Sequence, residues 1–278
     1  MRDSSVLPDL RMLATELLVT HEDCDPRRVE KLSYRILEEG CLKNPPMVAA
    51  IPDDERYVVL DGANRTMAFA HLHIPHMVAQ LVDYQNPEVV LDTWYHVVSG
   101  MGLEEFEDAL ARIDGLCLEA CSLEEARSAL EDGAILAYIA CESGVRKVCL
   151  PAGRQPRDMQ LLNDLVATYK GRADIFRASN DVWEKQKPYY PEITALVIFP
   201  CLDPEDILQA ARDGLKVPSG ITRHIIPARA LNINIPVGIL MADWSLERKR
   251  EWLHKWLMGR MADNAIRYYA ESTFSFNE

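Results

Sequence analysis

A turn between two predicted elements carries the residues best suited to binding a phosphate group. The apolar run 57–60 has the length of a buried strand, and it ends at Asp61-Gly62, a dipeptide that favours a tight turn. The next residues, Asn64-Arg65-Thr66 and those after them, predict a helix. The first N–H groups of a helix have no partner within it and attract anions, phosphate above all. Asp61 adds a carboxylate for a metal ion and Arg65 a cation; the alternative is an ordinary joint capped by Asp61.

A second polar cluster, His21-Glu22-Asp23, lies just ahead of the first predicted helix. Loops at the ends of apolar segments often carry function on a rigid scaffold. A carboxylate in such a loop, Glu22 in particular, is suited to act as a general base. The alternative is a solvated acidic loop, which is common on protein surfaces.

A third polar cluster, Thr222-Arg223-His224, lies inside a strand-like segment bounded by Gly220 and Pro227. In a half-buried strand, Thr222 and His224 share one face and Arg223 takes the other. Arginine offers a planar fork of donors and threonine a hydroxyl, so the three residues are suited to hold a carboxylate or a phosphate. The alternative is an edge strand with a solvated arginine.

Aromatic residues accompany these clusters. Trp94-Tyr95-His96 reads as core aromatics, and the closing segment 268–274 is too aromatic for a frayed tail, so we expect it to dock on the body of the protein. The sequence has no Walker loop, no Gly-x-Gly-x-x-Gly and no Gly-x-Ser-x-Gly elbow. It also has no Cys-x-x-Cys and no His-x-x-x-His pair, so no metal-ligand spacing is evident.

The elements that position these clusters alternate between helix and strand, which predicts a mixed α/β fold. In the first part, Asp25-Pro26 predicts a helix start and Gly40 its end. Strands are expected at 47–51, 57–60, 77–84 and 91–98. A boundary at 99–102 divides the chain into predicted domains 1–98 and 99–278, with the active site expected in the cleft between them.

The second part is also predicted to be mixed α and β. Ser122 and Glu125 form a capping box that opens a helix, and 134–141 with 145–150 form a predicted hairpin. The remaining expected helices are 103–113, 158–169, 203–214 and 245–261, and the remaining expected strands are 116–121, 193–199, 221–226 and 235–240.

The composition limits the classes of partner. The chain has 278 residues with 30 basic and 43 acidic side chains, a net charge of −13, which argues against nucleic acid as the main partner. A small anionic ligand remains compatible, because a few arginines set the local field. No apolar run approaches the ~20 residues of a bilayer span and the first residues lack a signal-peptide core, so a cytoplasmic protein without membrane contact is expected. The seven cysteines fit reduced thiols.

The order of motifs resembles a known superfamily. A strand, Asp61-Gly-x-x-Arg65, a helix, Ile74-Pro75 and a strand ending Val-Asp-Tyr84 are similar to the ParB/sulfiredoxin nucleotide-binding domains. Asn44-Pro-Pro46, Gly220-Ile-Thr-Arg-His-Ile-Ile-Pro227 and the Tyr-Tyr-x-Glu-Ser tail narrow the resemblance to the free L-serine kinases of that superfamily, over nearly the whole chain.

Other branches fit less well at the turn. Sulfiredoxins carry a reactive cysteine in Gly-Cys-His-Arg where this chain has Gly62-Ala63-Asn64-Arg65. ParB proteins carry Gly-Glu-Arg-Arg there and continue into a helix-turn-helix domain. The serine kinases often have histidines in this turn, so Ala63-Asn64 is a departure from their pattern.

The resemblance implies an enzyme that transfers the terminal phosphoryl group of ATP or ADP to the hydroxyl of free L-serine, with Mg²⁺ as cofactor. It implies Glu22 as general base and Asp61 as the residue that holds Mg²⁺ or orients serine. The implied phosphate-binding residues are Gly62, Asn64, Arg65 and Thr66. The implied substrate-binding residues are Trp94, Thr222, Arg223 and His224.

Two alternatives stay open at this point. One is a ParB-like nucleotide-binding regulator or DNA-binding protein without kinase activity, which the acidic balance and the missing helix-turn-helix disfavour. The other is a nucleotide-binding domain that has lost catalysis. Neither the donor, ATP or ADP, nor the pathway nor the oligomeric state is specified by these motifs.

Overall fold

The computed structural model describes residues 7–269. The chain forms two compact units, the first made of residues 1–90 with 226–278 and the second of residues 91–225. Helices and strands alternate in both units, which confirms the predicted mixed α/β class. The units meet along the chain after residues 90 and 225, whereas the sequence predicted one boundary after residue 98. The strand that contains this residue lies inside the second unit's sheet, and the segment from 226 onward returns to the first unit.

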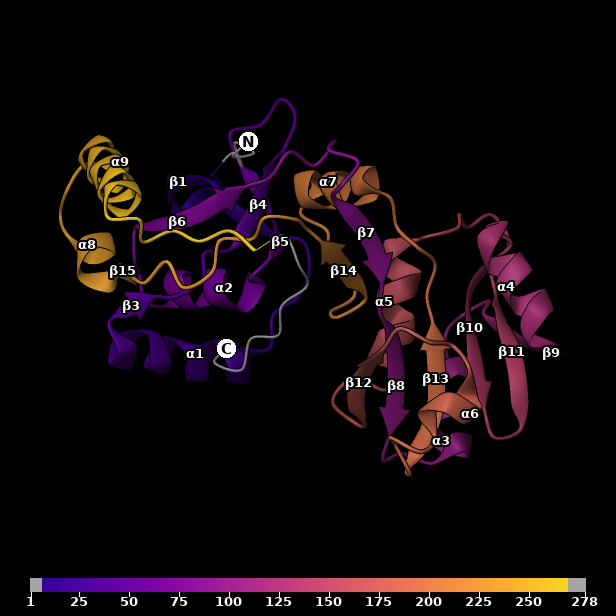
Figure 1. Ribbon diagram of the computed structural model, residues 1–278. Helices are drawn as coiled ribbons and strands as arrows, with labels where there is room; N and C mark the ends of the chain where they lie inside the picture. The colour runs from indigo at the N-terminus through magenta and orange to yellow at the C-terminus, as the bar shows by residue number, and fades with distance from the viewer. Residues whose placement is uncertain (1–6, 270–278) are drawn as a thin grey trace. The chain divides into compact units, whose positions relative to one another are not determined.

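The first unit is built on a five-stranded mixed sheet in the order β1-β6-β4-β5-β2 (Figure 1). β1 pairs with β6 and β4 with β5 in antiparallel fashion, whereas β2–β5 and β4–β6 are parallel. The strands are β1 (Asp9–Ala14), β2 (Leu18–Thr20), β4 (Met47–Ala50), β5 (Tyr57–Asp61) and β6 (His76–Leu81). Three of them were predicted; β1, which contains two charged residues, and β2, which has only three residues, were not.

Helices α1 (Pro26–Glu39) and α2 (Ala63–His71) pack on each other beside this sheet. α1 begins and ends as the sequence predicts: the Asp25 side chain accepts a hydrogen bond from the Arg27 N–H, and Gly40 takes a left-handed conformation with φ of 66°. A short 3₁₀ turn, Thr15–Leu17, joins β1 to β2.

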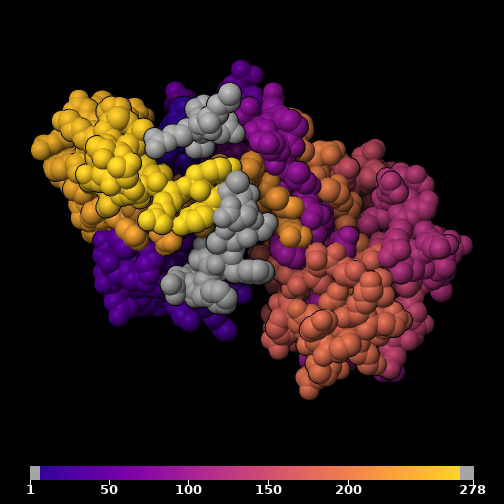
Figure 2. Space-filling model, in the orientation of Figure 1, coloured from indigo at the N-terminus to yellow at the C-terminus, as the bar shows by residue number. Residues whose placement is uncertain are grey.

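The C-terminal segment completes the first unit. β15 (Ile235–Pro236) pairs with β3 (Cys41–Leu42), and α9 (Leu246–Ala262) packs against β1 and forms part of the surface (Figure 2). The strand predicted over 235–240 is wrong beyond Pro236, because the chain turns there into the helix α8 (Val237–Met241). Val237 and Leu240 are buried three positions apart, a helical spacing that a short apolar run does not distinguish from a strand.

The core of the first unit joins sheet, helices and C-terminal segment. Phe69 of α2 is fully buried among residues from β4, β5 and β6, and α8 and α9 contribute further side chains to the same cluster. The C-terminal residues in it include Ile235, Val237, Leu240 and Leu253. Residues nearly two hundred positions apart in sequence therefore share one hydrophobic core.

The second unit is built on a six-stranded antiparallel sheet in the order β12-β8-β13-β10-β11-β9 (Figure 1). The predicted hairpin is confirmed as β10 (Ile135–Cys141) and β11 (Gly144–Cys149). The other strands are β8 (Tyr95–Ser99), β9 (Cys117–Cys121), β12 (Asp174–Ala178) and β13 (Ile193–Ile198).

The strand predicted over 91–98 is divided in two. β7 (Val90–Thr93) pairs with β14 (Thr222–Ile225) in a separate two-stranded sheet, whereas β8 enters the six-stranded sheet. The break falls at Trp94, whose N–H donates to the Ile221 carbonyl at 2.8 Å. An apolar run gives no sign of a change of sheet, because both halves keep strand geometry.

Five helices flank the described strands of the second unit. Those predicted from the sequence are α3 (Leu103–Ala111), α4 (Leu123–Glu131), α5 (Met159–Ala167) and α7 (Pro204–Asp213), and the short α6 (Trp183–Gln186) was not predicted. α4 packs on β10 and β11, where Ala126 lies in a buried cluster with Tyr138 and Leu196. Within residues 7–269, none of the helices combines the length and the apolar character that a bilayer span requires.

The capping box of α4 gives a test of the local fold. The Ser122 hydroxyl accepts from the Glu125 N–H at 3.2 Å, and the Glu125 carboxylate accepts from the Ser122 N–H at 2.8 Å. Ser122→Ala should lower the unfolding free energy by about 1 kcal/mol in urea titrations. Ser128→Ala, on the same helix and outside the cap, should change it by less than about 0.5 kcal/mol; equal losses in the two variants would contradict this account.

Candidate functional site

The turn from β5 into α2 depends on Gly62. This residue has φ of 94°, and a Cβ placed on it would lie 3.0 Å from both Cα and Cβ of Pro46. Only glycine fits this close approach in a left-handed conformation without strain. α2 starts directly after Gly62 with no side-chain cap, so the N–H groups of its first turn point out of the helix start, as an anion site requires.

The predicted phosphate-binding residues take three different positions around this turn. Arg65 lies against it, with Nη1 3.4 Å from the Pro45 carbonyl. Thr66 is 1% exposed, and its hydroxyl donates to the Gly62 carbonyl at 3.2 Å, so it holds the turn from inside. Asn64 has its Oδ1 atom buried with no hydrogen-bond partner among the described residues, a buried acceptor that a ligand donor or a cation would satisfy.

Asp61 is the last residue of β5, directly before the turn, and forms an ion pair with Arg229. Both side chains are nearly half exposed. Arg229 reaches this position because the chain after residue 226 runs beside β6: the Gln80 side chain donates to the Ala228 carbonyl at 3.1 Å and accepts from the Ala230 N–H at 2.8 Å. Arg229 was not predicted, since only the fold of the C-terminal segment brings it to Asp61.

Glu22 lies two residues beyond β2 in the same unit and is largely buried, with 13% of its side chain exposed. The neighbouring His21 ring is buried, and its Nδ1 lies 2.7 Å from the Val59 carbonyl. Because a carbonyl only accepts, Nδ1 carries a proton, and Nε2 lies 3.9 Å from the Glu22 carboxylate. The hydrogen bond from His21 to Val59 anchors the cluster to β5, the strand that leads into Asp61.

The requirement for glycine at position 62 is measurable. Gly62→Ala should lower the unfolding free energy by about 1–3 kcal/mol, because the new Cβ meets Pro46 and the left-handed backbone is unfavourable for alanine. Gly259→Ala is the matched control, since Gly259 lies in α9 with open space around its Cα and an ordinary helical backbone. Urea denaturation of both variants checks this; a neutral Gly62→Ala would show that the turn tolerates a side chain.

The second unit places the other predicted residues around β14. The Arg223 guanidinium lies over the Trp94 ring, 4.3 Å from its centroid, and its Nη1 is 3.3 Å from Oδ2 of Asp92. Thr222 and His224 occupy the alternate positions of the strand, as the period of two predicts. Trp94, Thr222, Arg223 and His224 therefore come from two neighbouring segments, β14 and the residue after β7. The acidic partner Asp92 was not predicted.

A buried histidine supports the turn that precedes β14. His96 is 1% exposed, and its Nδ1 lies 2.9 Å from the hydroxyl of the fully buried Tyr169. Its Nε2 is buried without a hydrogen-bond partner among the described residues, and would lie 3.5 Å from a Cβ on Gly220. That same Cβ would be 3.1 Å from the Arg177 guanidinium. Gly220, with φ of 88°, thus permits the tight packing of this turn.

Burial lowers the pKa of His96 to about 4, and the nearby backbone of Gly220 opposes the shift only in part. The unfolded chain therefore binds this proton first as the pH falls from 6.5, and folding stability is lost between pH 6.5 and about 4. The loss is on the order of 3 kcal/mol. In His96→Gln this part of the pH dependence should disappear from the urea midpoints, whereas His254→Gln, on an exposed position of α9, should keep it. An unchanged pH slope in His96→Gln would contradict this assignment.

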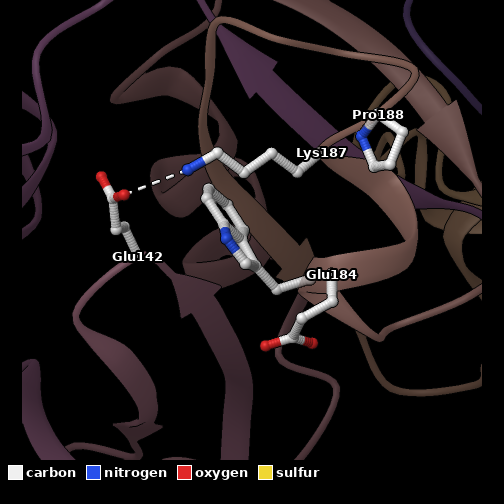
Figure 3. A pocket seen from close by; sticks show the side chains of 5 residues that line it. Glu142, Glu184, Lys187 and Pro188 are labelled. Carbon is white, nitrogen blue, oxygen red and sulfur yellow. Dashed lines mark hydrogen bonds and ion pairs between the residues drawn. The ribbon is translucent and has the colours of Figure 1, made fainter.

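One open depression in the second unit lies apart from these residues. It has a volume of about 500 Å³ and is lined by Glu142, Trp183, Glu184, Lys187 and Pro188 (Figure 3). Lys187 donates to Glu142 at 3.0 Å across it, and both side chains are exposed. None of the predicted site residues lines this depression.

The aromatic tail is only partly described. Tyr268 and Tyr269 are exposed, and the predicted docking of segment 268–274 otherwise concerns residues 270–274, which lie outside the described residues.

The chain has the fold of the free serine kinases. Its structure superposes on SbnI with C-terminal truncation from Staphylococcus aureus with a TM-score of 0.73 at 22% identity, covering 91% of this chain and 97% of that one. A free serine kinase in complex with AMP matches with a TM-score of 0.69 at 19% identity, over 86% and 98% of the two chains. A mutant of a free serine kinase in complex with ADP gives 0.68.

Sequence comparison confirms the resemblance that the motifs predict. The chain is 22% identical over 266 residues to the ATP-dependent L-serine kinase SbnI of Staphylococcus aureus, covering 95% of this chain and 96% of that protein. It is 23% identical over 239 residues to the ATP-dependent L-serine kinase of Staphylothermus marinus, and 20% over 229 residues to the ADP-dependent L-serine kinase SerK of Thermococcus kodakarensis; these cover 82% of this chain. No family model matches the chain.

Proposed function

We propose that this protein is a kinase that transfers the terminal phosphoryl group of a nucleotide to the hydroxyl of free L-serine, giving O-phospho-L-serine. The observation that carries this proposal is similarity over most of the chain's length to relatives that are L-serine kinases by name. Phosphoryl transfer needs positioning, neutralisation of charge and a group that accepts the hydroxyl proton. The described residues supply candidates for all three.

The nucleotide is assigned to the turn between β5 and α2. The N–H groups at the start of α2 would bind phosphate oxygens, with Gly62 giving the close backbone approach and Arg65 a positive charge. Thr66 would act by holding the turn through its hydrogen bond to Gly62. Asn64 would offer its buried Oδ1 to a donor of the nucleotide or to a cation's water.

Asp61 is the residue assigned to Mg²⁺. A half-exposed carboxylate beside a phosphate site fits this ion, which is commonly held by one or two carboxylates together with substrate phosphates and water. The ion pair with Arg229 occupies one carboxylate oxygen, so the arginine would have to share or yield it. When bound, Mg²⁺ would neutralise charge on the phosphate groups.

Glu22 is assigned the role of general base. Its carboxylate is held beside the buried His21 ring, 3.9 Å from Nε2. A carboxylate in this position is suited to accept the proton of the serine hydroxyl.

Serine is assigned to the residues around β14. Arg223 would bind the carboxylate of serine or the phosphoryl group that is transferred. Thr222 and His224 would add hydrogen bonds from the same strand. Trp94 would wall the site and keep the guanidinium in place by its contact with Arg223. An incoming carboxylate would compete with Asp92 for the arginine.

The relatives divide between ATP and ADP as donor, so either nucleotide is compatible with this assignment. A cytoplasmic location, the absence of a nucleic-acid or membrane partner, and the domain division at residue 98 stay predictions. A ParB-like regulator without kinase activity is the alternative, and the similarity to kinases over most of the chain argues against it.

The direct test mixes the purified full chain with L-serine, Mg²⁺ and either ATP or ADP, and measures O-phospho-L-serine by mass spectrometry. Product is expected with one of the two donors, and only with the L-amino acid. Absence of product with both donors at high enzyme concentration would overturn the proposal.

Replacement of the proposed base separates chemistry from binding. Glu22→Gln should lower kcat by about 10²–10⁴-fold, because the neutral amide does not accept the hydroxyl proton. The Kd of the nucleotide, measured by calorimetry, should change by less than about threefold, since Glu22 is not assigned to phosphate binding.

Asp23→Asn is the matched control for this prediction. It neutralises the adjacent exposed carboxylate and should leave kcat nearly unchanged. Equal losses in the two variants would show that the charge of the loop matters rather than the base, and full activity of Glu22→Gln would remove Glu22 from the mechanism.

A further inference from the structure

Two cysteines and a glutamate meet at the edge of the second unit's sheet. Cys117 of β9 lies directly opposite Cys149 of β11 in the antiparallel pair, and Glu119 lies two positions further along β9. Residues two apart in a strand point to the same face, so the three side chains share one face of the sheet. The two sulfur atoms and a carboxylate oxygen all lie within 4.8 Å of one another. Among the described residues, no other group of three such ligands comes this close.

This arrangement comes from strand register and not from sequence spacing. Cys117 and Cys149 are separated by the whole of α4 and the strand β10, so no Cys-x-x-Cys pattern announces them. On the same face, Cys121 and Val145 at the other end of the strand pair pack against the core of the unit. Cys117 is exposed and Cys149 half-buried, so the face opens to solvent at the end where the two thiols meet.

The electrostatic surroundings favour a cation. Two sulfur atoms and a carboxylate oxygen lie within 4.8 Å of one another, and the Lys147 Nζ lies 3.6 Å from Glu119. A bound cation would relieve this crowding more directly than the lysine does, because it would contact all three groups.

The ligand set selects the kind of cation. Thiolates favour soft or borderline metals over Mg²⁺ and Ca²⁺, and a carboxylate completes many zinc sites. In a tetrahedral zinc site, Zn–S distances of about 2.3 Å and Zn–O distances of about 2.0 Å place the ligand atoms roughly 3.5–3.8 Å apart. Side-chain rotations that move the ligand atoms by about an ångström would bring them from their present spacing to this geometry.

We propose that Cys117, Glu119 and Cys149 bind one thiophilic divalent cation, Zn²⁺ in kind, with water at the fourth position. The cation joins the edge strand β9 to β11 across one face of the sheet. It would hold the edge strand to its neighbour at the end where the two thiols meet. The site is independent of the proposed kinase activity.

The test uses the full chain, reduced and stripped of metal, and titrates it with Cd²⁺ while the thiolate-to-cadmium absorption in the near ultraviolet is followed. One Cd²⁺ per chain is expected, and Zn²⁺ should displace it. Cys117→Ser and Cys149→Ser should each weaken Cd²⁺ binding at least about 100-fold, and Glu119→Gln about tenfold. Glu119 is exposed, so its variant tests the site with little risk to folding.

Cys201→Ser is the matched control, because Cys201 is an exposed cysteine outside the cluster. It should keep the full affinity and stoichiometry. The proposal is overturned if the wild-type chain shows no stoichiometric thiolate–cadmium absorption, or if the Cys117 and Cys149 variants keep it. It is also overturned if the reduced chain binds no metal and the two cysteines only form a disulfide, seen as a mass loss of two hydrogens on mild oxidation by glutathione disulfide.

Discussion

The close approach of Gly62 to Pro46 is the constraint on which the first unit's site depends. It allows β5 to turn into α2 within one residue, and it leaves the helix start without a side-chain cap. Asp61 and Arg65 are then held on either side of the same backbone turn, and Glu22 is anchored to β5 through His21. A wider turn would separate the acid, the cation and the helix N–H groups that the proposed chemistry uses together.

Each unit holds an arginine against a carboxylate: Arg229 with Asp61 in the first, and Arg223 with Asp92 in the second. The chain has a net charge of −13, and each pair holds an arginine side chain at the proposed site, so that it does not turn toward other carboxylates. An anionic substrate would displace a partly exposed carboxylate from the arginine. Breaking such an exposed ion pair costs less free energy than breaking a buried one. Both arrangements are therefore suited to exchange a protein carboxylate for a ligand oxygen.

Local signals in the sequence predicted much of this structure, and long-range contacts explain the rest. The caps at Asp25, Gly40 and Ser122 fixed helix boundaries, and the turn at Gly62 was evident from strand, glycine and helix in order. The strand over 91–98 was divided because Trp94 pairs with Ile221, more than a hundred residues away. Arg229, Asp92 and the Cys117–Cys149 pair share this cause, since each is brought to its partner by tertiary structure or strand register. The predicted roles of the site residues stay predictions until they are measured.

The central claim is that the nucleotide binds at the turn of the first unit and serine at β14 of the second. Calorimetric titration of ADP and of O-phospho-L-serine into the full-length variants Arg65→Met and Arg223→Met tests it most directly. The account predicts a crossed result: Arg65→Met weakens ADP about tenfold or more and leaves O-phospho-L-serine within about twofold, and Arg223→Met does the reverse. Equal weakening of both ligands by either variant, or no change in either, would contradict the assignment of the two ligands to separate clusters.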